Sequence, residues 1–199
     1  MRPVLTVGLL CSLMATTLPA QSEWQATIEV GSTSFSSAAH DTNNPATNVH
    51  ASLDGMYTLR FTRETLRSGI AIALSYSSGF LEGYVENFSV VPGDGIQLVE
   101  IAPEGRFAVG RTSTGATLWV HAGPVFDFWS VGGNDPNSRI GGLAGATLAL
   151  PLSPRWRVDV RGDFAISASY ADKEEEGPNL IRPSTMRRGR IALGITKKL

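Results

Sequence analysis

Arginine and aspartate alternate in one segment near the C-terminal end of the chain, where their spacing invites a test for chemistry. Arg157, Asp159, Arg161 and Asp163 occupy every second position. Two carboxylates can act as general acid and base, but Asp159 and Asp163 would lie about 13–14 Å apart along an extended strand. Glycosidases hold such a pair about 5–9.5 Å apart. Because arginines alternate with both aspartates, the pattern predicts ion pairing rather than acid–base catalysis.

The elements that must position these residues are β-strands, because alternation with a period of two recurs along the chain and turn residues interrupt it. Helical periodicity is nearly absent beyond the first residues. We predict an all-β protein with eight antiparallel strands, at residues 24–35, 50–62, 69–80, 96–110, 116–129, 139–151, 155–170 and 186–198.

The two faces of each predicted strand differ in polarity. In segment 155–170, Trp156, Val160 and Phe164 share an apolar face, whereas Arg161 and Asp163 belong to the other face. Such a strand would approach about 50 Å in length. A tilted membrane strand needs only about nine to eleven residues to cross a bilayer. Aromatic residues near the ends of the apolar face are typical of interfacial girdles, so we expect this face to meet lipid.

If the apolar face meets lipid, the charged face must line a barrel interior. The residues with this parity are Glu29, Asp54, Arg60, Glu100, Glu104, Arg106, Asp127, Arg157, Asp159, Arg161, Asp163, Arg188 and Arg190. Side chains fill the interior of an eight-stranded barrel, and buried charges are costly unless paired. The near balance of acids and bases predicts an ion-paired plug, and a gated ion path is the alternative. The first and last strands must pair, so Arg188 or Arg190 is expected to meet Glu29 across that seam.

The histidines are the remaining candidates for catalysis or metal binding. His50 and Ser52 resemble the His-x-Ser element of outer-membrane lipid A deacylases, with Glu64 downstream. A charge relay needs all three within hydrogen-bond reach, yet the predicted strands put Glu64 in a turn far from His50. His121 is expected to pack inside the barrel, and His40 has too few neighbouring ligands for a metal. We therefore predict no catalytic, metal or cofactor site.

The first twenty residues have the features of a secretory signal peptide. Arg2 supplies a positive charge, residues 4–18 are largely apolar, and Ala20 ends the segment. This organisation predicts export, with residues 1–20 as the signal peptide and 21–199 as the barrel. Cys11 is the only cysteine and lies inside the signal segment. The formal net charge of −1 offers no footprint for nucleic acid.

The predicted connections alternate between short and long, as in up-and-down barrels of the outer membrane. With this pattern and a strand at the C-terminal end, the chain resembles the small outer-membrane barrel family of the OmpA-transmembrane, OmpX and opacity-protein type. The resemblance implies an eight-stranded transmembrane barrel, contact with outer-membrane lipid and passage through the barrel-assembly machinery. Family members usually end in an aromatic residue. This chain ends in Leu199, and Lys197 interrupts the apolar alternation before it.

The sequence thus predicts a non-enzymatic outer-membrane barrel that acts in envelope integrity or surface contact. The longer connections, including the acidic run at 172–176, are the expected contact elements. A secreted soluble barrel that binds a small apolar ligand, with lipocalin-like architecture, is the main alternative. It would put the apolar face inside. A lipid A-modifying enzyme is the third possibility and depends on His50.

Overall fold

The computed structural model describes the greater part of the chain, and every statement below refers to this part. The described ranges are 23–35, 39–41, 48–85, 88–90, 95–131, 137–168, 181–183 and 185–199, and side chains are not described at 39–41, 48–52, 54, 81–85, 88–90, 131 and 181–183. The predicted signal peptide and the acidic run at 172–176 lie outside these ranges. In the described ranges, no helix is long and apolar enough to span a bilayer.

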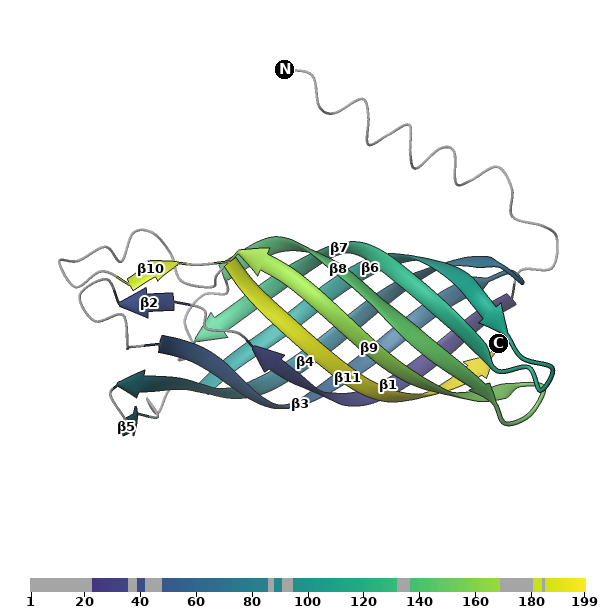
Figure 1. Cartoon of the computed structure of the whole chain (residues 1–199), viewed down its shortest axis with the longest axis horizontal. Helices are drawn as coiled ribbons and strands as arrows, with labels where there is room; N and C mark the ends of the chain where they lie inside the picture. The colour runs from purple at the N-terminus through teal and green to yellow at the C-terminus, as the bar shows by residue number, and fades with distance from the viewer. Residues whose placement is uncertain are drawn as a thin grey trace, which may run out of the picture.

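Eight long strands form the wall of the molecule. They are β1 (Glu23–Phe35), β3 (Asn48–Glu64), β4 (Ser68–Val85), β6 (Gly95–Arg111), β7 (Thr117–Val131), β8 (Asn137–Pro151), β9 (Trp156–Ala168) and β11 (Thr185–Lys198). Three short strands, β2 (Ala39–Asp41), β5 (Phe88–Val90) and β10 (Ile181–Pro183), extend the sheet at one end (Figure 1). The all-β prediction and its eight strands are confirmed, with small differences at the strand ends.

The sheet closes on itself as an up-and-down antiparallel barrel. Around the ring the long strands follow the order β1, β11, β9, β8, β7, β6, β4 and β3, and β3 pairs again with β1. The seam joins β1 to β11 from Gln25↔Lys198 to Phe35↔Arg188. Figure 1 shows the strands tilted around a cylinder, as closure requires.

Tight turns close the end of the barrel that carries the C-terminus, hereafter the short-turn end. The turn between β3 and β4 is fixed by Thr65, whose hydroxyl accepts a 3.1 Å hydrogen bond from the Ser68 amide. The turn between β6 and β7 contains Gly115 with φ of 88°, a conformation that favours glycine. The short strands β2, β5 and β10 lie at the opposite end (Figure 1), hereafter the long-loop end.

The apolar side chains point outward and the charged ones inward. Val160 and Phe164 expose 37% and 49% of their surface, whereas Arg161 is buried. This is the facing expected for a membrane barrel, because the outer wall meets lipid and the lumen is polar. A soluble barrel with an apolar interior requires the opposite facing. The lipocalin-like alternative is therefore opposed by the orientation of the wall.

One segment of β3 reverses the facing that the sequence predicts. Simple alternation puts Leu53 on the same outward face as Gly55, but Leu53 is only 6% exposed and lies inside the barrel. The register of β3 shifts against both of its neighbours here. Against β4 the shift lies between Leu53 and Gly55, and against β1 it lies between Leu53 and Met56, which marks a β-bulge. A bulge inserts an extra residue and so changes the parity of everything before it. Asp54 lies in this bulge, and its side chain is outside the described part.

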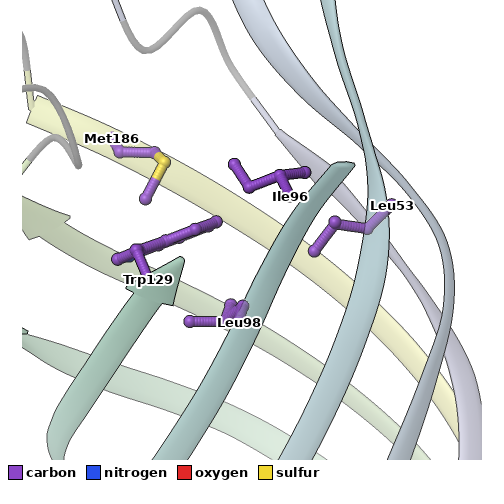
Figure 2. Packing of buried hydrophobic residues seen from close by; sticks show 5 residues of the cluster. All are labelled: Leu53, Ile96, Leu98, Trp129 and Met186. Carbon is purple, nitrogen blue, oxygen red and sulfur yellow. The ribbon is translucent and has the colours of Figure 1, made fainter. Parts of the chain in front are cut away.

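An apolar cluster fills the lumen toward the long-loop end, and the bulge brings Leu53 into it. Figure 2 shows its members converging from β3, β6, β7 and β11: Leu53, Ile96, Leu98, Trp129 and Met186. Phe35 packs against the cluster, with its ring 5.9 Å from the Trp129 ring in an edge-to-face arrangement. The sequence predicts an ion-paired polar plug. Alternation already puts four cluster members on the face of the charged residues, and only Leu53 needs the bulge to join them.

Two prolines face each other in the wall between β6 and β7. The β6–β7 register runs through Ile101↔Phe126, is interrupted, and resumes unchanged at Gly105↔Ala122. That register sets Pro103 opposite Pro124, and neither residue has an N–H to donate. The sequence suggests a bulge at residues 103–105, but the register shift lies between Ala108 and Gly110. The prolines interrupt the hydrogen bonds of the ladder without inserting a residue.

Candidate functional site: an ion-paired lumen

The ion pairs nearest the long-loop end cross the full width of the barrel. Arg190 on β11 donates two hydrogen bonds to Glu100 on β6, of 2.6 and 2.7 Å. Arg188 donates to both carboxylate oxygens of Asp127 on β7, at 2.9 and 2.7 Å. β11 and β6 stand four places apart in a ring of eight strands. The forked Arg190–Glu100 pair therefore bridges opposite walls just below the apolar cluster. Arg188 reaches β7, three places from β11, through Nη2 alone, and also lies 5.9 Å from the Trp129 ring.

A second group occupies the middle of the lumen. Arg60 on β3 pairs with Glu29 on the adjacent β1 and lies 3.6 Å from Glu104 on β6. Arg161 on β9 donates to Glu104 at 2.8 Å and to Asp163 at 2.7 Å. Carboxylates and guanidiniums thus alternate across the barrel, as buried charges require.

His121 joins this middle group through a gap made by glycine. Its Nε2 lies 2.7 Å from Asp163 Oδ1, although β8 separates β7 from β9. The bridge passes over Gly145 of β8, where an added Cβ would lie 2.3 Å from Asp163 Oδ1 and 2.6 Å from His121 Nε2. The absence of a side chain at this position makes the contact possible. The sequence predicts a packed lumen histidine but not its partner.

A third group lies toward the short-turn end and centres on Glu64. Arg106 donates to Glu64 at 2.7 Å, and Arg157 donates to it at 2.7 and 3.2 Å. Arg157 also reaches Asp159, which accepts a further 2.7 Å hydrogen bond from Thr196. The sequence puts Glu64 in a turn, but β3 extends to this residue and directs it inward. The signal was available, since Glu64 keeps the parity of Arg60 on the same strand.

The lumen opens below this third group. A cavity of about 600 Å³ lies at the short-turn end, between the turns and the ends of β1 and β11. Its walls include Gln25, Glu64, Trp119 and Arg157, which mark its inner limit. Above that level lie the two other ion-pair groups and the apolar cluster. A second cavity of about 590 Å³ borders Asp163 and Arg190 of those groups.

Most predicted lumen residues lie where parity put them, but one predicted contact is wrong. Glu29 meets Arg60 rather than Arg188 or Arg190. The seam register explains the difference, because Glu29 stands opposite Gly194 while Arg190 stands opposite Thr33. Four residues along a strand separate the two by about 13 Å. Apart from Asp54, all the predicted lumen residues have side chains inside the described barrel.

The structure opposes the two catalytic arrangements considered from the sequence. The aspartates of β9 are each bound by arginine, and Asp163 also contacts His121. Among the described residues no three His, Cys, Asp or Glu side chains form a potential metal site. His50 and Glu64 lie near opposite ends of β3, roughly 45 Å apart. That separation rules out the charge relay with Glu64 on which the lipid A deacylase resemblance depends.

Comparisons with known proteins agree on the fold. No protein-family model and no curated protein matches the sequence. Among solved structures, outer membrane protein OprG from Pseudomonas aeruginosa aligns with a TM-score of 0.61 and 9% identity, over 89% of this chain and 95% of that one. Outer membrane protein AlkL, solved in DMPC bilayers, gives 0.61 and 10% identity over 94% and 97%.

A major outer membrane protein from Thermus thermophilus gives a TM-score of 0.53 and 13% identity, over 90% of this chain and 100% of that one. At these identities the likeness concerns the fold. The chain has the fold of small outer-membrane β-barrels, and the outer-membrane location predicted from the sequence agrees with all three structures.

Proposed function

We propose that the protein is a non-enzymatic outer-membrane barrel with a closed lumen, which serves envelope integrity or surface contact through its outer loops. The observation that carries the proposal is the forked pair between Arg190 and Glu100, which joins opposite walls of the barrel. With the Arg188–Asp127 pair and the apolar cluster, it obstructs the path that a solute would need.

The long-loop end supports a role in contact. β3 and β4 have 17 and 18 residues, well beyond the nine to eleven that a tilted strand needs to cross a bilayer. Their outer ends carry the small strands β2 and β5, and β10 pairs with β2. The wall thus continues past the membrane as a paired sheet, a rigid base on which loops can present a binding surface.

The same proposal includes a route of export and membrane insertion. Residues 1–20 would direct export and be removed, and the barrel-assembly machinery would insert residues 21–199 into the outer membrane. Lipid is then the partner of the whole outward face.

Planar-bilayer recording of the purified full-length mature protein tests the closed lumen. We expect no steady conductance, because ion pairs and apolar side chains cross the path that water would need. The double variant Arg188→Ala/Arg190→Ala removes the two ion-paired arginines nearest the long-loop end and should give brief channel openings. A large, stable conductance from the unmodified protein would contradict the proposal and assign the barrel as a pore.

A further inference from the structure

Two tryptophans on the outward face at the short-turn end each lie beside a basic side chain. The Arg63 guanidinium carbon is 5.8 Å from the centre of the Trp24 ring, and the Lys197 ammonium is 5.5 Å from the Trp156 ring. Trp24 and Trp156 expose 52% and 44% of their surface. Both are cation–π contacts, which leave the indole and the charge together at the surface.

The strand register sets these two pairs side by side. Trp24 stands opposite Arg63 on β3, and Lys197 stands opposite both Ala26 on β1 and Trp156 on β9. The four residues therefore span the consecutive strands β3, β1, β11 and β9. We call Arg63, Trp24, Lys197 and Trp156 the basic–aromatic patch.

The carboxylates described at this end of the barrel are engaged elsewhere. Glu64 and Asp159 are buried in the lumen with Arg157, and Glu23 pairs with Lys198 at 2.6 Å. Lys197 has no ion pair among the described residues, and the neighbour of its ammonium is an aromatic ring. Lys197 thus contributes positive charge on the outward face, near the end of β11.

We propose that the basic–aromatic patch binds the phosphate of an anionic phospholipid in the leaflet at the short-turn end. Indole rings favour the headgroup level of a bilayer, and long basic side chains reach from an apolar wall toward that level. A zwitterionic lipid brings its own cation, so an anionic headgroup gains more from Arg63 and Lys197. The proposal gives Lys197 a role at a position where the alternation of β11 favours an apolar residue. It rests on the membrane location and is independent of whether the lumen conducts.

The four tryptophans of the chain provide the test, because two report on the patch and two do not. Trp119 and Trp129 are 2% and 1% exposed inside the barrel, so lipid cannot reach them. The full-length mature protein is reconstituted in phosphatidylcholine vesicles that contain phosphatidylglycerol brominated near the headgroup. Quenching of tryptophan fluorescence is compared with that by brominated phosphatidylcholine.

We expect the anionic lipid to be preferred, by about five-fold for each basic side chain near the surface. Arg63→Gln and Lys197→Gln should each lower the preference, and the double variant should abolish it. Lys198→Gln is the matched control, since it removes the same charge one residue away but on the Glu23 pair, and it should keep the preference. Equal quenching by the two lipids, or an equal loss in Lys198→Gln, would overturn the proposal.

Three further measurements secure the interpretation. Heat-modifiable migration on gels shows whether each variant is folded, and added salt should weaken the preference of the unmodified protein if it is electrostatic. Soluble glycerol phosphate should leave the preference unchanged. If glycerol phosphate abolishes it, the site binds free phosphate and the assignment to lipid is wrong. A preference insensitive to salt would likewise overturn the proposal.

Discussion

The two halves of the lumen are filled in different ways. Toward the long-loop end, Glu100 and Asp127 are bound by arginines beneath an apolar cluster. Toward the short-turn end, Glu64 and Arg157 border a cavity of about 600 Å³. The chemistry of the pairs is the same, but the Arg157 side chain is 14% exposed, whereas those of Arg188 and Asp127 are fully buried. The comparison teaches that an ion pair stabilises this barrel according to what covers it, because removing a partner is costly only where the remaining charge stays dry.

The largest effect should come from Glu100→Ala. This change leaves the buried Arg190 without its forked partner and also removes the 3.2 Å contact of Arg188 with Glu100, so it should lower the free energy of unfolding by about 3–5 kcal/mol. Urea-dependent folding in lipid vesicles measures the loss. Glu100→Gln keeps the volume and an acceptor oxygen and should lose less. A loss below that of Arg157→Ala would break the distinction between the halves.

Val160→Arg tests the premise that both halves lie inside one lipid-facing wall. Arginine on the lipid face near mid-membrane should destabilise the folded barrel by about 2–4 kcal/mol. Folding yield and stability in bilayers measure the effect, with Val160→Leu as the control that stays near neutral. Normal folding of Val160→Arg would mean that the facing of β9 is inverted.

Gly145→Ala addresses the boundary between the halves, where His121 crosses β8. The new Cβ would meet Asp163, His121 and the carbonyl oxygen of Gly162 at 2.3–2.6 Å. The resulting strain should cost about 1–3 kcal/mol. Gly142→Ala on the same strand is the matched control, since nothing lies within 4 Å of its added Cβ. Equal stability of the two variants would show that the crossing contact is dispensable.

The smallest effect should come from Arg157→Ala in the wet half. The Arg157 side chain is 14% exposed. When the Arg157 guanidinium is removed, Glu64 keeps Arg106 as a partner. Water in the cavity can solvate what remains, so the loss should be about 1 kcal/mol or less. Arg157→Lys serves as the control. A loss as large as that of Glu100→Ala would show that both halves are equally dry.

Alternation in the sequence was sufficient to predict the strands and the side of the wall that each charge occupies. Arg161 and Val160 illustrate this, because neighbouring residues of a strand must face opposite sides. Alternation could not predict which charged residues pair with one another. Strand tilt slides β11 along β1, so that Arg190 meets Glu100 on the far wall rather than Glu29 on the neighbouring strand.

Local departures from regular pairing were equally inaccessible. The bulge near Gly55 turns Leu53 inward. A glycine within a strand often marks a bulge, but it does not fix which neighbouring residue is the extra one. The meeting of His121 with Asp163 depends on Gly145 standing between them on a third strand. The alternation within single strands contains no information on such three-strand contacts.

The facing prolines of β6 and β7 have a consequence for motion. Pro103 and Pro124 remove two amide hydrogens from one rung of the ladder, and a Cβ built on the neighbouring Gly123 would lie only 1.9 Å from the Pro103 carbonyl oxygen. The strands are therefore held at this point by close backbone approach rather than by conventional hydrogen bonds. The wall therefore has a local weak point for hydrogen exchange between β6 and β7. Amides beside it should exchange by local opening, while those along the uninterrupted β9–β11 ladder wait for the whole barrel to unfold.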